Sequence, residues 1–198
     1  MARGKHDAFE TLPIQGAARP RVPPGLPWLQ EAARMLDAAH APGLQDGPAR
    51  LSLVARLDRA LPFDLPWCGA FAAHCLRAAL PGMRRPWLYM RARPWLGWGE
   101  PAQPQLGALL VFWLRWEGSP FGHVGFCWGE DDDHFHVLGG NQRDRIAVER
   151  FPKSRLIGCR WPAGVPRPAL RRLLPEHAAA LCEHVDPDSE TAAARAAG

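Results

Sequence analysis

Apolar residues recur with the spacing of a helix in the first half of the chain. In the segment 27–36 they gather on one helical face, which holds Trp28, Ala32, Met35 and Leu36. Residues 49–60 show a second, shorter helical pattern. A third helix is predicted to begin at Cys68 and to end before Pro81-Gly82. The first half of the chain is therefore predicted to be helical.

The second half shows the pattern of short strands. Apolar or alternating runs of strand length are separated by turns rich in glycine, proline and aspartate. These runs cover residues 108–113, 121–128, 134–138, 145–151 and 156–161. Helices followed by a meander of strands predict an α+β fold, in which N-terminal helices pack on a roughly five-stranded antiparallel sheet. One more helical pattern spans residues 169–184.

The length of 198 residues predicts one domain with flanking segments. Residues 1–26 are rich in Pro, Gly and Arg and are predicted to form an N-terminal arm. Residues 27–162 would form the folded domain, and residues 163–198 a C-terminal helix and tail. No apolar run approaches the roughly 18 residues of a membrane span, and the polar N-terminus leads into no signal-peptide pattern. We therefore expect no membrane span and synthesis in the cytoplasm.

Charge and cysteine usage narrow the possible ligands. The net charge is +4 and the arginines are scattered, which argues against nucleic acid as a partner and suits a polyanionic surface. The five cysteines include no C-x-x-C pair, so neither a disulfide framework nor a structural zinc site is expected. His134 and His136 share a strand face near Asp131–Asp133, yet no third ligand follows at metal-site spacing. We expect neither a metal nor a cofactor.

Cys68 has the location of a nucleophile. It follows Pro66-Trp67 in the first turn of a predicted helix, where the positive end of the helix dipole lowers a thiol pKa. Gly69 and Ala70 are small, so other groups can approach the helix closely. The second cysteine of this helix, Cys75, lies in an apolar run and is predicted to be a core residue.

His123 is the candidate base. Strand alternation places it on one face with Gly125 and Cys127, and the glycine leaves space in front of the imidazole. A helix-start cysteine and a strand histidine can meet where helix and sheet pack, which predicts a thiolate–imidazolium pair with Cys68. A structural histidine, satisfied within the core, is an equally good interpretation of His123 alone.

The base needs a third group to hold its tautomer. The next predicted strand ends in Gly139-Gly140-Asn141-Gln142, and hairpin geometry would return this end to His123. Asn141 can accept a hydrogen bond from the ring, and His136 is its competitor. Asn141 could instead be only a turn residue after two glycines. Three tryptophans, Trp87, Trp95 and Trp98, either cap the core or line a groove.

Several segments resemble a known group of proteins. Pro66–Phe71 resembles the helix start of the NlpC-type and CHAP (cysteine, histidine-dependent amidohydrolase/peptidase) superfamily of cell-wall peptidases, whose fold is papain-like. The likeness is closer to a small NlpC-like subfamily of phages and bacteria, through residues 27–29, 95–101, 122–126, 137–142 and 151–158. It covers about residues 27–162. It departs at residues 105–108, where the aspartate of the family's usual turn is absent.

The resemblance implies that residues 27–162 are an NlpC/CHAP-like catalytic domain with the triad Cys68, His123 and Asn141. It implies cleavage of an amide bond in peptidoglycan through a thioester acyl-enzyme, with Trp67, Trp95 and Trp98 as candidate groove walls. Two other functions stay open. One is a catalytically silent wall-binding or virion structural module, and the other is a papain-like acyltransferase or deamidase that acts on protein.

Two routes to the cell wall fit a product without a signal peptide. The protein could be a phage-type lysin or part of a phage tail. It could also be a secreted antibacterial effector, with a neighbouring immunity protein as its partner. In both cases we expect it to act in the periplasm or cell wall.

Overall fold

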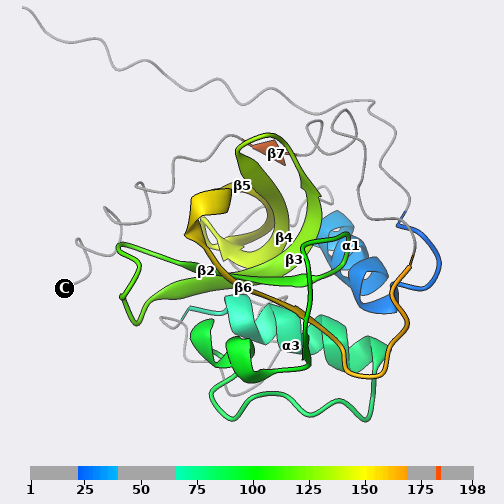
Figure 1. Cartoon of the computed structure of the whole chain (residues 1–198). Helices are drawn as coiled ribbons and strands as arrows, with labels where there is room; N and C mark the ends of the chain where they lie inside the picture. The colour runs from blue at the N-terminus through cyan, green and yellow to red at the C-terminus, as the bar shows by residue number, and fades with distance from the viewer. Residues whose placement is uncertain (1–21, 40–65, 169–181, 184–198) are drawn as a thin grey trace, which may run out of the picture.

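A computed structural model describes residues 22–39, 66–168 and 182–183 (Figure 1). Two α-helices, α1 (Pro27–Ala39) and α3 (Cys68–Ala79), precede the short 3-10 helix η1 (Arg93–Gly97). The strands are β1 (Glu100–Pro101), β2 (Leu109–Trp113), β3 (Gly122–Glu130), β4 (His134–Gln142), β5 (Arg145–Pro152), β6 (Leu156–Trp161) and β7 (Cys182–Glu183), with the 3-10 helix η2 (Lys153–Arg155) before β6.

The strands of the described residues form one sheet in the order β1-β6-β2-β3-β4-β5-β7. All pairs are antiparallel except β5 and β7, which run parallel. In Figure 1, β4 and β5 form the strongly curled part of the sheet, and β4 also contacts α3. The predicted α+β fold with N-terminal helices on an antiparallel sheet is confirmed, and the sheet is extended at its edges by the two-residue strands β1 and β7.

The helices bury the faces that their sequences predict. Trp28, Ala32, Met35 and Leu36 are all buried, and the Trp28 indole donates to the carbonyl of Gly107 at 2.8 Å. Helix α3 packs on α1 and on strands β3 and β4, where the Phe71 and Phe126 rings lie 6.3 Å apart. The small residues Gly69, Ala70, Ala72 and Ala73 are also buried. Helix α3 thus packs against both α1 and the sheet.

Most predicted elements shift by one to three residues at an end, and two boundaries change the arrangement of the sheet. Strand β4 continues through Gln142 and does not stop at Leu138, because Gly139 still pairs with Ala147 on β5. The helix predicted over residues 169–184 is wrong at its end, where Cys182–Glu183 is a strand beside β5. The structure does not describe residues 169–181, where the rest of this helix was predicted. The helix predicted at 49–60 and most of the two predicted terminal segments also lie outside the described residues. Within the described part, no helix has the length and hydropathy to cross a membrane.

Candidate active site at the start of α3

Helix α3 begins at Cys68 without a side-chain cap. Its N-cap residue is Trp67, which makes no side-chain hydrogen bond to the first turn. The first backbone N–H groups of a helix have no partner within the helix, and they carry the positive end of its dipole. No acidic residue stands in this first turn to offset that charge. The sequence-based prediction that Cys68 lies in the first turn of a helix is confirmed, and its side chain is only 2% exposed.

The start of α3 is fixed to the end of β4. A Cβ at Gly140 would collide with the Trp67 ring and would lie 2.6 Å from the Cβ of Phe71. The Trp67 indole also donates to the Asp144 carboxylate at 3.1 Å, just beyond β4. Only a glycine at position 140 lets the helix approach this closely. Gly140 therefore sets the distance between the helix that carries Cys68 and the strand beside it.

His123 is held by Gln142 on the neighbouring strand. The imidazole Nε2 lies 3.0 Å from the Oε1 of Gln142. The Nε2 of Gln142 donates to the carbonyls of Val137 at 3.2 Å and Ala147 at 2.7 Å. Both amide protons are used in these two bonds, so Oε1 must accept from the histidine. The arrangement fixes the tautomer with a proton on Nε2, which leaves the Nδ1 lone pair of His123 to accept a proton.

The backbone of β4 explains why Gln142 reaches His123. A Cβ at Gly139 would lie 2.6 Å from the Oε1 of Gln142 and 3.0 Å from the Nε2 of His123, so glycine leaves the space in which the two side chains meet. The pairing of β4 with β5 shifts register between Gly139 and Gln142, and Asn141 has a positive φ of 60°. This irregularity turns the Gln142 side chain back toward the imidazole.

The two glycines connect both halves of the site. Gly139 faces the His123 ring, whereas the next residue, Gly140, faces Trp67 and Phe71 of α3. The β3–β4 ladder ends at the pair Phe126–Leu138, so the strands continue past this point without further pairing. The residues beside Cys68 and the ring of His123 thus meet at consecutive positions of β4, beyond the last pair that it forms with β3.

The His123 ring is buried beside an aromatic side chain. It is 3% exposed and stacks on Phe151, with the ring centroids 4.7 Å apart and an interplanar angle of 12°. Burial lowers its pKa to about 4, against a smaller opposing effect of the Gln142 hydrogen bond. Burial opposes the charged imidazolium that the predicted thiolate–imidazolium pair requires, and the pair with Cys68 stays a prediction.

We expect His123 to stay neutral well into the acid range. Its ring should titrate near pH 4, measured by NMR of the imidazole signals, and not near the ordinary 6.5. In the unfolded chain the ring takes up its proton at about pH 6.5. The unfolded state then binds the proton and the folded state does not, so the free energy of unfolding should fall as the pH drops from about 6.5 toward 4. A ring charged at pH 7 would contradict this.

Neither of the two predicted orienting groups is hydrogen-bonded to His123 among the described residues. Asn141 makes no side-chain hydrogen bond among the described residues, and Gln142, its neighbour, holds the ring instead. His136, the alternative orienting group, donates a hydrogen bond from its Nε2–H to the Asp131 carboxylate at 2.8 Å. Gln142 makes the hydrogen bond to the ring that was predicted for Asn141. The sequence offered one signal for Gln142: a long amide side chain directly after a double glycine and an asparagine suited to positive φ.

The predicted tryptophan walls are mostly core. Trp95 is fully buried and donates to the Tyr89 carbonyl at 2.8 Å, and Trp98 is 6% exposed and donates to the Arg84 carbonyl at 3.0 Å. Their rings pack edge to face, 5.5 Å apart. These contacts contradict a role as groove walls for both residues. Trp67 is 4% exposed and packs on Gly140, so it supports the start of α3.

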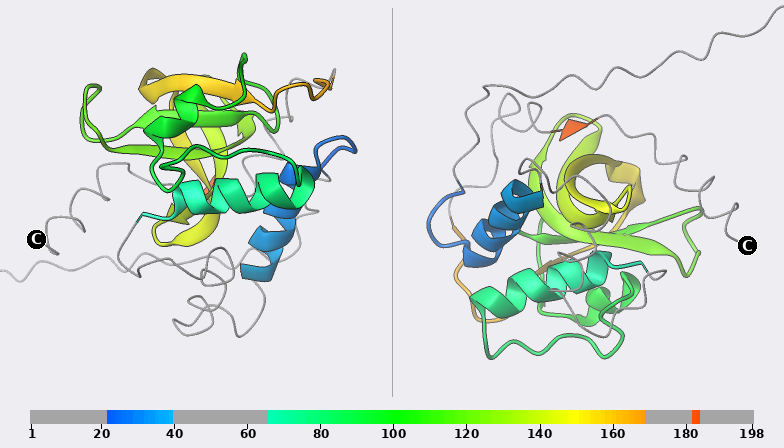
Figure 2. Two further views of the ribbon diagram at one scale, coloured as in Figure 1. Left: turned by 90° about the horizontal axis from the view of Figure 1, so that it is seen from below. Right: turned by 180° about the vertical axis from the view of Figure 1, so that it is seen from behind.

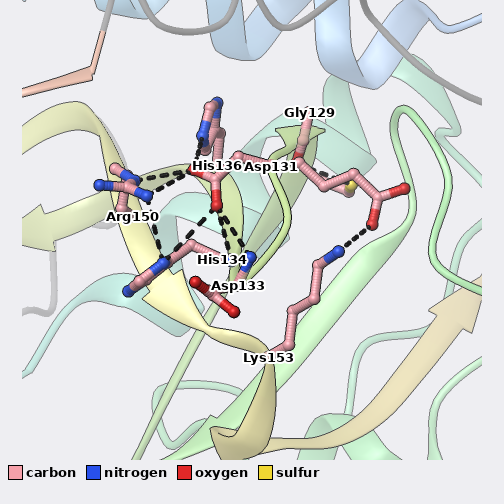
Figure 3. Close-up of polar contacts among 9 residues, drawn as sticks. Gly129, Asp131, Asp133, His134, His136, Arg150 and Lys153 are labelled. Carbon is pink, nitrogen blue, oxygen red and sulfur yellow. Dashed lines mark hydrogen bonds and ion pairs between the residues drawn. The ribbon is translucent and has the colours of Figure 1, made fainter.

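A separate polar cluster occupies the β3–β4 turn (Figure 3). The Asp131 carboxylate accepts hydrogen bonds from the His134 backbone at 2.9 Å, from His136 and from Arg150 Nε at 2.9 Å. Burial raises the Asp131 pKa, but these hydrogen bonds outweigh it and hold the pKa well below its usual range. No group of three potential metal ligands stands among the described residues. The cluster ties the turn to β5.

Replacing Asp131 should weaken the fold without touching the site. In Asp131→Asn the amide cannot accept all of these bonds, and we expect the free energy of unfolding at pH 7 to fall by about 1–3 kcal/mol. Because the folded pKa is depressed, the carboxylate stabilises the fold above its ordinary pKa of about 3.9, and the difference should shrink below that pH. Urea denaturation measures both effects. Asp133→Asn, at an exposed carboxylate of the same turn, is the control and should change little.

The CHAP domain family model matches residues 61–141, a segment that contains Cys68 and His123 and ends one residue before Gln142. This match confirms the resemblance to the CHAP/NlpC-type cysteine peptidase superfamily for that part of the chain. The comparisons with curated proteins and with solved structures gave no match. The narrower NlpC-like subfamily is supported only by the sequence motifs.

Proposed function

We propose, from the CHAP match over residues 61–141, that the protein hydrolyses an amide bond in peptidoglycan with Cys68 as nucleophile. CHAP domains are commonly hydrolases that act on peptidoglycan. The observation that carries the proposal is the hydrogen bond from His123 Nε2 to Gln142, because it leaves Nδ1 as a base. A neutral imidazole has one unprotonated nitrogen, and the hydrogen bond to Gln142 determines that this is Nδ1.

The first half of the reaction forms an acyl-enzyme. The Cys68 thiol proton passes to Nδ1 of His123 as the sulfur attacks the carbonyl carbon of the scissile amide. The resulting oxyanion is stabilised by the N–H groups of the uncapped first turn of α3, which include the amide of Cys68. His123 then gives its new proton to the leaving amine. The C–N bond breaks, and a thioester joins the substrate acyl group to Cys68.

The second half restores the enzyme. Neutral His123 takes a proton from water through Nδ1 while the water oxygen attacks the thioester carbon. The C–S bond breaks, the product leaves as a carboxylic acid, and the proton returns to Cys68. Gln142 keeps the ring in one orientation in both halves, and its Oε1 supports the positive charge that His123 carries briefly. The thiol is almost fully buried, so the surroundings of Cys68 must open for the substrate.

The proposal extends to where the enzyme acts. A phage-type lysin and a secreted antibacterial effector both meet peptidoglycan in the periplasm or cell wall. The effector route adds an immunity protein as partner, and the phage route adds a tail component. Co-expression of the gene's neighbours in a susceptible cell distinguishes the two, because only an effector should have a neighbour that suppresses lysis.

Purified peptidoglycan tests the reaction class. Wild-type protein should release fragments with new amino groups and no new reducing sugars, because an amide and not a glycosidic bond is cut. With added hydroxylamine, part of the product should appear as hydroxamate, since a thioester acyl-enzyme can be intercepted by a stronger nucleophile. New amino groups without hydroxamate would argue against the covalent intermediate.

The two alternative functions give different results in the same assay. A silent wall-binding or virion module would sediment with the peptidoglycan and release nothing. A protein acyltransferase or deamidase would leave the peptidoglycan intact and modify a glutamine-containing protein, with ammonia release or amine incorporation as the readout. Either result would contradict the proposed hydrolase.

A further inference from the structure

The connection between β2 and β3 presents aromatic side chains to solvent. Trp116 is 57% exposed and Phe121 is 46% exposed, whereas most large apolar side chains of the described chain are buried. Exposed aromatic area is unfavourable in water, and a contiguous patch of it commonly marks a binding surface. These two residues lie in one short hairpin connection, which we call the aromatic hairpin and define as residues 113–121.

The aromatic hairpin is held in one shape. Ser119 N–H donates to the Trp116 carbonyl at 2.9 Å, and Phe121 N–H donates to the Ser119 hydroxyl at 3.0 Å. From outside the hairpin, Arg93 donates to the Glu117 carbonyl at 2.6 Å. A surface that is already ordered loses little conformational entropy when a ligand binds. The hairpin backbone is therefore already ordered at the positions of Trp116 and Phe121.

Arginines lie over two of the aromatic rings. The guanidinium of Arg115 is 4.0 Å from the centroid of the Phe121 ring, and that of Arg155 is 4.8 Å from the centroid of the Trp113 ring. Each pair combines a flat apolar ring with a charged fork of hydrogen-bond donors. A pyranose ring has the matching chemistry, because its C–H face is apolar and its rim carries hydroxyl oxygens that accept hydrogen bonds. A lipid interior would reject the charges placed on these rings.

The aromatic hairpin stands next to the candidate active site. Phe121 precedes His123 by two residues at the start of β3. All views in Figures 1 and 2 show the β2–β3 connection projecting past the N-terminal end of α3, the end that carries Cys68. A long polymer bound along the hairpin would thus pass the end of the helix where the reaction is proposed.

We propose that the aromatic hairpin is a subsite for the glycan strand of the substrate. Trp116 and Phe121 stack on sugar rings, and Arg115 donates hydrogen bonds to their hydroxyl oxygens. This inference rests on the proposed function and deepens it, because it assigns the carbohydrate part of peptidoglycan to a surface separate from the groups that cut the amide bond.

The test measures binding with the full chain carrying Cys68→Ala, so that nothing is digested. The probes are glycan strands stripped of their peptides, and anionic phospholipid vesicles. We expect binding to the glycan strands and a loss of about tenfold or more in affinity on adding Trp116→Ala, as for an aromatic anchor that contributes more than 1.4 kcal/mol. Trp116→Phe should retain part of the affinity. Trp87→Ala removes an even more exposed tryptophan (94%) outside the hairpin and should change nothing.

Each remaining outcome overturns the inference. No binding to the stripped glycan strands, equal affinity with and without Trp116, or binding to vesicles alone would each do so. Thermal unfolding of Trp116→Ala verifies that the fold is intact. The inference and the proposed function can fail separately: Trp116-dependent glycan binding without any amide cleavage by the wild type would leave a binding module, and cleavage without glycan binding would leave a hydrolase that recognises peptide only.

Discussion

Cys68→Ala should abolish the release of amino groups from peptidoglycan, with a loss in kcat/KM of at least about a thousandfold. The substitution removes the only atom that can form the thioester, and no other group at the start of α3 can replace it. The fold should survive, because alanine fits wherever the slightly larger cysteine does and the first turn of α3 keeps its hydrogen bonds. The measurement compares initial rates on the same peptidoglycan at equal concentrations of folded protein, with circular dichroism as the control for folding.

Cys75→Ala is the matched variant for this experiment. Cys75 lies in the same helix and is fully buried, and burial raises the pKa of its thiol well above the ordinary value. A thiol held protonated in this way is a poor nucleophile, so Cys75→Ala should keep close to wild-type activity and lose only about 1 kcal/mol of stability from the small cavity. Activity that survives Cys68→Ala but is lost in Cys75→Ala would identify Cys75 as the nucleophile and contradict the proposed mechanism.

Local patterns predicted most of the fold. The buried face of α1 follows from the helical spacing of its apolar residues, and the first residue of α3 follows from Pro66. Both signals span only a few residues of sequence. Strand β6 was predicted with the same bounds that it has in the structure. The end of β4 was predicted too early, because Gly139-Gly140 has the composition of a turn. Those glycines remain in the strand since Gly139 pairs with Ala147 and Gly140 fits against Trp67, contacts that only the folded chain supplies.

The site was predicted less completely than the fold, for the same reason. Cys68 and His123 carry chemistry that a sequence displays directly. The sequence does not show whether an indole faces a groove or the core, and Trp95 lies in the core. The choice between Asn141 and Gln142 depends on a register shift and on the space left by Gly139. Strand alternation cannot predict such a reversal of side-chain direction.

Gln142→Ala should lower kcat/KM by about a hundredfold, because the imidazole loses the group that fixes its orientation and tautomer. The stability should also fall, by about 1–3 kcal/mol, since the carbonyls of Val137 and Ala147 lose their donors. A structural role alone would not change the state of His123. Nitrogen NMR of the imidazole should show the Nε2-protonated tautomer in the wild type and a mixture of tautomers in Gln142→Ala. The pKa of His123 should fall further, because the Gln142 hydrogen bond raises it.

Asn141→Gly separates this prediction from the one made from sequence motifs. Glycine accepts the positive φ of 60° at position 141 without strain, so the variant removes the asparagine side chain and leaves the backbone as it is. If Gln142 holds the base, Asn141→Gly should keep near wild-type kcat/KM and an unchanged tautomer of His123. The opposite pattern, with loss of activity in Asn141→Gly and none in Gln142→Ala, would return the orienting role to Asn141. It would also mean that the hydrogen bond between His123 and Gln142 breaks when substrate binds.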